Sequence, residues 1–288
     1  MANLILSAFA DEYAPDLDGQ LEGMDRLGIR FIEPRHIDGK NIADLTAAEA
    51  ALLKKKLEQH GIGVSAIGSP LGKITLDDDF SAHLEKARNV FETARILGTN
   101  MVRMFSFYPG QGQNIADCRD QVFSRLEALI TLAEEYSIVL CHENESRIYG
   151  ESPERCLELL EHFGGRMKCV FDMGNFLLGG YDPYPKAYTL LKKHIAYFHI
   201  KDALRRGSIV PPGAGKAKIP EILADHCANM QQDFFVSLEP HLTVFKGLQN
   251  LTSEAIDTPF VYPDAKAAFT DAVNKLKEIL SHETLSHR

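Results

Sequence analysis

The chain has 288 residues, 45% of them hydrophobic and 25% charged, and a net charge of −9. This composition is typical of a globular protein that buries a large core. The acidic balance argues against a nucleic-acid partner, which usually requires a basic surface, but it does not exclude a small anionic substrate. No apolar stretch is long enough to cross a membrane. The five cysteines lack CxxC spacing and no signal peptide is evident, so we expect reduced thiols in a cytoplasmic protein.

One unit recurs along the chain: an amphipathic helix, a glycine and a short apolar strand. The glycines stand where a helix end favours a left-handed residue, at Gly28, Gly61, Gly98 and Gly164. Helix starts are marked by Thr46 with Glu49 and by Ser152 before Pro153. We predict strands at 4–10, 29–34, 64–68, 101–106, 138–143, 167–172, 195–201 and 234–239. Helices fall between them, and a last helix covers 264–280.

Eight strands alternating with helices predict a (β/α)₈ TIM barrel that forms a single domain over residues 1–288. A doubly wound open sheet is the alternative, and it is disfavoured because no strand is followed by a GxGxxG turn. The stretch "PPGAGKAK" at 211–218 is not a phosphate-binding loop, because Val210 stands where a glycine is required and Ala217 where a Ser or Thr is required.

Polar residues close four successive strands of the predicted barrel: Glu143, Asp172, His199 and Glu239. In a barrel of this type the active site lies at the carboxyl ends of the strands. A single acid at a strand end is usually a helix cap or a solvated residue, but four candidates on adjacent strands favour a shared site. Two Glu, one Asp and one His suit one divalent ion, Mn²⁺, Mg²⁺ or Co²⁺, with Zn²⁺ also possible.

The stretches "LCHEN", "VFDMGN", "FHIKD" and "SLEPH", one per strand, resemble the xylose-isomerase-like TIM barrels, the sugar-phosphate isomerase/epimerase superfamily. "SAFADE" and "PGAGKAKIPEIL" extend the resemblance over nearly the whole chain. It implies that Glu143, Asp172, His199 and Glu239 are metal ligands, and that Glu143 and Glu239 are the acid/base carboxylates. Arg205 matches a substrate-contacting arginine. Asn175 departs from the ketose 3-epimerases, which carry a histidine there.

Further polar residues are candidate substrate contacts. Lys201 shares a strand face with His199 and, with Arg205, could bind an enolate oxygen or a phosphate; the alternative is a salt bridge to Asp202 or another acid. The remaining candidates are Glu33, His36, Arg103, Asn175 and His241. The aromatic residues near strand ends could stack on a sugar or belong to the core: Phe105, Phe107, Tyr108 and Phe176. Histidines on helices or chain ends are expected to be solvated: His83, His162, His226 and His282.

These features favour a metal-dependent isomerase or epimerase of a small sugar or polyol. A lyase of the same fold, dehydrating a polyol ketone or eliminating from a 3-keto glycoside, begins with the same proton abstraction and stays open. Endonuclease IV-type DNA repair needs more histidines and a basic face. A non-catalytic sugar-binding barrel would not need Glu143 and Glu239. We expect one metal site, with no second acid/His cluster. The family often forms dimers or tetramers, and residues 243–263 are a candidate contact or lid element.

Overall fold

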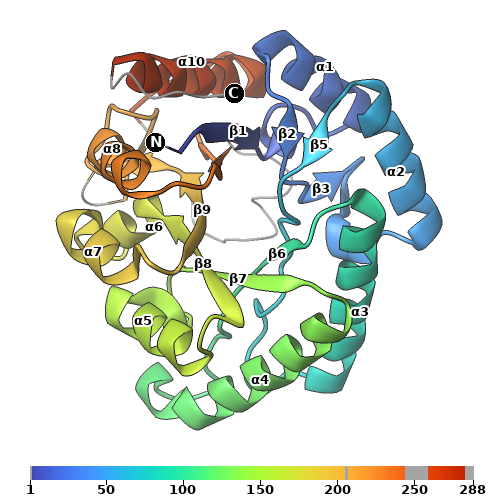
Figure 1. Cartoon of the computed structure of the whole chain (residues 1–288), viewed down its shortest axis with the longest axis vertical. Coiled ribbons are helices and arrows are strands. Elements are labelled where there is room, and N and C mark those ends of the chain that lie inside the picture. Colours follow the sequence, from blue (N-terminus) through green and yellow to red (C-terminus); the bar gives the residue numbers. More distant parts are fainter. Residues whose placement is uncertain (1, 205–206, 244–258, 283–288) are drawn as a thin grey trace.

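The computed structural model describes residues 2–204, 207–243 and 259–282. In this part of the chain, eight strands surround a common axis and helices form the outer ring (Figure 1). The strands are β1 (Leu4–Ala8), β2 (Phe31–Ile32), β5 (Gly63–Val64), β6 (Met101–Met104), β7 (Val139–Glu143), β8 (Met167–Asp172), β9 (Ile195–Ile200) and β12 (Phe234–Leu238). Every pairing among them is parallel. The predicted TIM barrel is confirmed.

The barrel closes through two kinds of contact. Six strands form one sheet in the order β1-β12-β9-β8-β7-β6, and β2 pairs separately with β5. Isolated backbone bonds join the two sheets. At one junction the Glu33 N–H donates to the Ala8 carbonyl (2.9 Å); at the other, the Ile67 N–H donates to the Met101 carbonyl (2.9 Å) and the Arg103 N–H to the Ile67 carbonyl (3.0 Å). The predicted strands at 29–34 and 64–68 therefore shrink to two regular residues each.

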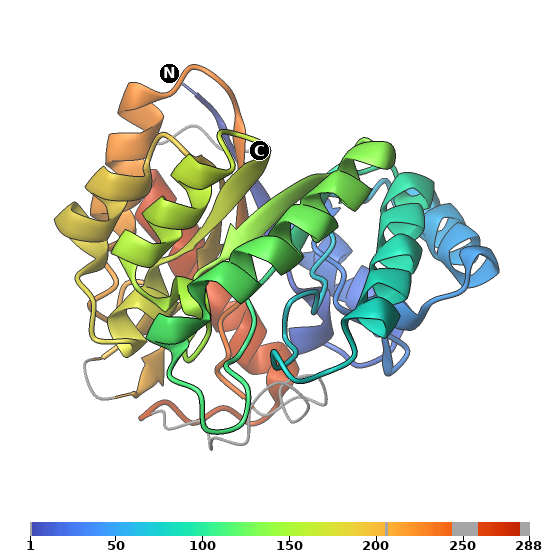
Figure 2. The same cartoon turned by 90° about the horizontal axis from the view of Figure 1, so that it is seen from below.

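The helices follow the strands in chain order around the ring (Figures 1 and 2). They are α1 (Leu17–Leu27), α2 (Ala47–Gln59), α3 (Phe80–Leu97), α4 (Arg119–Glu135), α5 (Pro153–His162), α6 (Met173–Leu178), α7 (Tyr188–Leu191), α8 (Ile219–Asn229) and α10 (Ala265–His282). The Thr46–Glu49 capping box is present. Gly28 ends α1 with φ +68°, a left-handed conformation that costs glycine little. The sixth helical position is divided between α6 and α7.

Short turns and two-stranded ladders lie at the face of the barrel where the strands end. A 3₁₀ turn, η1 (Ala10–Glu12), follows β1. The ladder of β3 (His36–Ile37) with β4 (Lys40–Asn41) follows β2, and the ladder of β10 (Asp202–Ala203) with β11 (Ile209–Val210) follows β9. In the side view of Figure 2, the N-terminus lies at the opposite face, where the strands begin.

Apolar residues form two layers. The larger one lies between the strands and the helices, and a smaller one fills the lumen around Ala66, Cys141, Val170 and Tyr197. Alternation along β7 places Glu143 on the same side as Cys141, one step nearer the carboxyl end. The lumen therefore changes from apolar to charged toward that end.

Two histidines correct the sequence analysis. His83 and His226 were expected to be solvated, but they are only 6% and 2% exposed. His83 accepts a hydrogen bond from the Gly72 N–H at Nε2 (2.9 Å), and His226 packs edge-on against Phe198 and Phe234. None of the described helices is long and apolar enough to cross a membrane.

Candidate metal centre and active site

The four side chains that end successive strands converge at the top of the lumen. Glu143 closes β7, Asp172 closes β8, His199 lies near the end of β9, and Glu239 follows β12. One potential ligand atom from each lies within 4.8 Å of the others, and all four residues are buried. Such a set, three carboxylates and an imidazole, is the donor chemistry that divalent first-row ions and Mg²⁺ accept.

Glu33 contacts the imidazole of His199, and the Tyr197 hydroxyl in turn contacts Glu33. Nε2 of His199 is 3.0 Å from Oε2 of Glu33, whose other oxygen accepts a hydrogen bond from the Tyr197 hydroxyl (2.9 Å). Nδ1 faces the other way, 3.1 Å from Glu143. Glu33 is fully buried, and its two oxygens contact His199 and Tyr197; its role as a substrate contact stays a prediction. A carboxylate in this position fixes which ring nitrogen is free for a metal.

Lys201 lies among the candidate ligands. Its Nζ is 3.0 Å from Asp172, 3.1 Å from Glu239 and 3.1 Å from the side-chain oxygen of Asn175. The sequence left open whether Lys201 binds substrate or forms a salt bridge to Asp202 or another acid; the structure shows salt bridges to Asp172 and Glu239, and binding of substrate stays a prediction. The amide of Asn175 also reaches Glu143 (3.3 Å), so both residues border the space above the four ligands.

The Asp202 carboxylate instead stabilises the loop that follows it. It accepts hydrogen bonds from the backbone N–H groups of Ala203, Gly213, Gly215 and Ala217, at 2.8 to 3.0 Å. A Cβ at Gly215 would collide with this carboxylate, so a glycine is required there. The glycines of "PPGAGKAK" therefore allow the backbone of this loop to surround the Asp202 carboxylate, which follows Lys201 in the sequence.

Two buried arginines complete the charged layer. Arg103 contacts Glu143 (3.2 Å). Arg35 contacts Glu239 (2.7 Å) and makes a two-pronged pair with Asp11 (2.9 and 3.0 Å). Both guanidinium groups lie over the ring of Phe9, which also meets His199 edge-on. Sequence reasoning missed Arg35, Asp11 and Phe9, although Arg35 shares the strand parity of Glu33.

Burial and charge act against each other on the pKa values of this layer. Burial alone would raise the pKa of Glu143, but the charges of His199 and Arg103 outweigh it and lower the pKa to about 2. Burial opposes ionisation of Glu239 too, yet Lys201 and His241 hold its pKa well below the usual range. For Asp172, burial prevails over Lys201 and raises the pKa to about 6. Glu143 and Glu239 are therefore ionised at neutral pH.

A second acid/His cluster lies beside the first and shares Glu239 with it. Its potential ligand atoms, from Glu12, Glu239 and His241, are within 4.8 Å of one another. The expectation that no second acid/His cluster exists is therefore wrong. Sequence reasoning missed it because Glu12 belongs to η1, a turn that the predicted first strand did not foresee.

The charge of the layer fits a divalent ion. Six buried carboxylates, from Asp11, Glu12, Glu33, Glu143, Asp172 and Glu239, face four cationic side chains, Arg35, Arg103, Lys201 and His199. Burial raises the pKa of Glu12 to about 8, so this acid is mostly protonated at neutral pH and the other five carboxylates still outnumber the four cations. Burial lowers the pKa of His199, but the acids Glu33 and Glu143 more than reverse this and raise it to about 10. Buried carboxylates need paired positive charge, and a divalent ion at the four ligands would supply the charge that the protein lacks.

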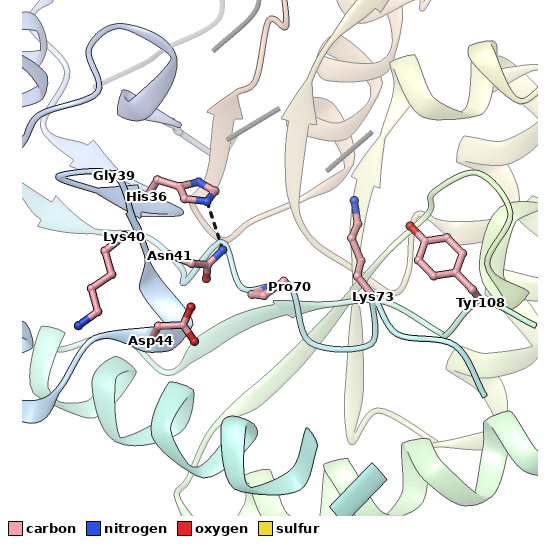
Figure 3. A pocket seen from close by; sticks show the side chains of 8 residues that line it. All are labelled: His36, Gly39, Lys40, Asn41, Asp44, Pro70, Lys73 and Tyr108. Carbon is pink, nitrogen blue, oxygen red and sulfur yellow. Dashed lines mark hydrogen bonds between the residues drawn. The ribbon is translucent and has the colours of Figure 1, made fainter. Parts of the chain in front are cut away.

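A cavity of about 520 Å³ opens beside the charged layer. Its lining includes His36, Asn41, Lys73 and Tyr108, and in Figure 3 His36 and Asn41 lie across the space from Lys73 and Tyr108. His36 contacts Asp11 (3.2 Å), and Lys73 pairs with Glu145 (3.0 Å), two residues beyond Glu143. The volume is in the range of small-molecule sites. Of the four aromatic candidates, only Tyr108 lines this cavity; Phe105, Phe107 and Phe176 are fully buried.

His241 and Arg205 are the remaining predicted substrate contacts. His241, two residues beyond Glu239, lies 3.3 Å from that carboxylate. Arg205 lies outside the described residues, as does most of the 243–263 segment.

Comparison with known proteins identifies the family. Residues 22–241 match the family model of the xylose isomerase-like TIM barrel. The chain belongs to this family. No curated protein matches the chain significantly.

Solved structures of the same fold cover nearly the whole chain. A probable 3-DHS dehydratase, AsbF from Bacillus anthracis, is 17% identical with a TM-score of 0.71, covering 96% of this chain and 99% of its own. The IOLI protein with a bound zinc atom is 16% identical with a TM-score of 0.73, covering 97% and 99%. D-Psicose 3-epimerase from Clostridium cellulolyticum H10, solved with D-tagatose, is 13% identical with a TM-score of 0.73, covering 99% and 100%. At these identities the likeness shows the fold alone.

Proposed function

We propose that the chain is a divalent-metal-dependent isomerase or epimerase of a small sugar or keto-polyol, acting by proton transfer next to a carbonyl. The observation that carries the proposal is the convergence of Glu143, Asp172, His199 and Glu239 in a buried layer whose carboxylates outnumber its cations. The structural neighbours include an epimerase and a zinc-bound protein, which is consistent with this chemistry.

The proposed reaction assigns a role to each group of the site. A divalent ion at the four ligands would polarise a carbonyl and its neighbouring hydroxyl as a Lewis acid. Glu143 and Glu239 come from β7 and β12, which are separated in the sheet by β8 and β9. Because its low pKa keeps it ionised, either carboxylate can accept the proton of the C–H bond. The other carboxylate must first take a proton from solvent, which it can then deliver to the opposite face. The cavity lined by His36, Asn41, Lys73 and Tyr108 would take the rest of the substrate.

A lyase is the second candidate, and Lys201 is the observation that favours it. Its ammonium group is buried between Asp172 and Glu239, and these acids overcome the effect of burial, raise its pKa and keep it protonated. A cation beside the ligands can donate a hydrogen bond to a departing hydroxide or alkoxide and stabilise its negative charge after the same C–H abstraction; the leaving group then takes its proton from solvent. Elimination would produce an unsaturated ketone with a new ultraviolet absorbance, whereas isomerisation or epimerisation would not.

Solvent labelling tests the shared first step. Keto-sugars and keto-polyols incubated with the Mn²⁺-loaded protein in D₂O should acquire deuterium at the carbon next to the carbonyl, in product or in recovered substrate. EDTA should stop the labelling and Mn²⁺ should restore it. Turnover without deuterium incorporation would reject proton transfer and indicate an internal hydride shift.

A further inference from the structure

Glu239 presents its two carboxylate oxygens to two different clusters. Oε2 faces Lys201 (3.1 Å) and His199 (3.6 Å), on the side of Asp172 and Glu143. Oε1 faces Arg35 (2.7 Å) and His241 (3.3 Å), on the side of Glu12. A carboxylate that gives one oxygen to each of two adjacent cation positions is how binuclear metal sites are bridged, with ions about 3.5–4 Å apart.

A guanidinium group lies at the second of these positions. Nη1 of Arg35 contacts Glu239, and Nη2 is 3.3 Å from Oε1 of Glu12, so the group reaches both acids of the second cluster. Nε and Nη2 of the same guanidinium donate hydrogen bonds to Asp11 (2.9 and 3.0 Å), and its Cζ lies 4.5 Å from the centre of the Phe9 ring. The side chain is 1% exposed. Two-pronged pairing and stacking of this kind fix an arginine in one geometry.

We propose that Arg35 permanently holds the position of a second cation, so that the site takes one divalent ion where its acids and histidines could hold two. His241 supports the assignment, because its Nε2 is 3.5 Å from Glu12 and 3.3 Å from Glu239, and it completes a set of two carboxylates and an imidazole. A guanidinium satisfies the charge of these acids but has no coordination position to offer a substrate. The inference rests on the proposed function only for the ion at the first cluster.

Removal of the guanidinium should open the second position. Metal-free protein titrated with Mn²⁺ alone, by equilibrium dialysis, should bind about one equivalent in the wild type and about two in Arg35→Met. The two ions would share Glu239, so their electron paramagnetic resonance spectrum should show exchange coupling. Adding Glu12→Gln to Arg35→Met should return the count to about one. Arg35→Lys, which keeps a cation, should bind about one.

Arg103→Met is the matched control. It removes another buried arginine, whose ion pairs are with Glu143 (3.2 Å) and with Oε1 of Glu239 (3.7 Å) and not with Glu12, so the variant should still bind about one equivalent. If Arg35→Met does not fold, Arg35→Met with Asp11→Asn removes one charge of each sign and should also bind about two.

Two equivalents in the wild type, or one in a folded Arg35→Met protein, would overturn the inference. Absence of any bound ion in both proteins would overturn it together with the metal dependence. One ion in the wild type and two in Arg35→Met, without solvent labelling of any keto-sugar, would reject the proposed function and leave this inference standing.

Discussion

The two sides of the barrel differ in strand length and in what they contribute to the site. From β6 through β7, β8, β9 and β12 to β1, the strands have four to six residues and pair continuously; we call this the long-strand side. The short-strand side consists of β2 and β5, with two residues each, and their following loops. The long-strand side supplies the four candidate metal ligands. The short-strand side supplies Glu33 and Arg35, which support them, and much of the cavity lining.

This difference separates two tasks. Continuous pairing fixes the direction of every side chain, so the long-strand side can hold four ligand atoms at one height. A strand of two residues gives little such control, and buried ion pairs and hydrogen bonds take its place on the short-strand side. We therefore expect changes to the four ligands on the long-strand side to abolish the reaction, and a change to Glu33 on the short-strand side to weaken metal binding.

Glu239→Gln should have the largest effect. The variant keeps the shape of the side chain but removes a ligand and one of the two proton-transfer carboxylates, so turnover should fall by roughly 10²–10⁴-fold. Mn²⁺ affinity should fall as well, while the thermal transition remains cooperative. Steady-state assays and equilibrium dialysis measure both quantities.

Glu145→Gln is the matched control on the same side of the barrel. Glu145 lies just beyond β7, pairs with Lys73 at the cavity and is not one of the four candidate ligands. We expect a mild effect on turnover and none on Mn²⁺ affinity. Near-normal turnover in Glu239→Gln would remove Glu239 from the mechanism.

Glu33→Gln tests the short-strand side with a smaller expected effect. The amide can still meet the Tyr197 hydroxyl, but it no longer offers His199 a negative charge, and Mn²⁺ affinity should fall by about 10–100-fold. Tyr197→Phe, which leaves the Glu33 carboxylate in place, should weaken binding much less. If Mn²⁺ affinity is unchanged in Glu33→Gln, Glu33 does not orient the imidazole for the metal.

Acidification should affect stability without involving the reacting groups. Burial, followed by the charges of Lys86 and Arg125, lowers the pKa of His83 from 6.5 to about 4. Between these values the unfolded chain binds a proton that the folded chain does not, so stability should fall as pH falls from 6.5 to 4, by up to about 3 kcal/mol for this residue.

His83→Gln should flatten this dependence, because glutamine can accept the Gly72 N–H bond and does not ionise. Urea unfolding at pH 7 and pH 4.5 measures the change. An equal loss of stability on acidification in the wild type and in His83→Gln would show that His83 is not a source of it.

The same difference between the two sides explains what the sequence could predict. Glu143, Asp172 and Glu239 each follow an apolar run, and such a run predicts both the strand and the side of the strand on which its last side chain lies. The barrel and the convergence of these residues could therefore be predicted from the sequence. The partners of Arg35 did not, because Asp11 and Glu12 lie in a 3₁₀ turn 23 or 24 residues away in sequence. Long-range ion pairs between turns leave no periodic signal.

Glu33 and His83 show a related limit. A polar residue at a strand end or on a helix can face solvent or be buried with a partner, and the two cases have the same sequence pattern. Only the positions of Tyr197, His199 and Gly72 decide between them, and these are set by the closed barrel.

Anomalous diffraction from crystals grown with Mn²⁺ would test the central claim most directly, that Glu143, Asp172, His199 and Glu239 together hold one divalent ion. The account predicts one anomalous peak coordinated by these three carboxylates and by Nδ1 of His199, with Nε2 still bonded to Glu33 and the guanidinium of Arg35 still between Glu12 and Glu239. No peak at these residues, or a peak in the cavity beside His36 and Lys73 alone, would contradict it.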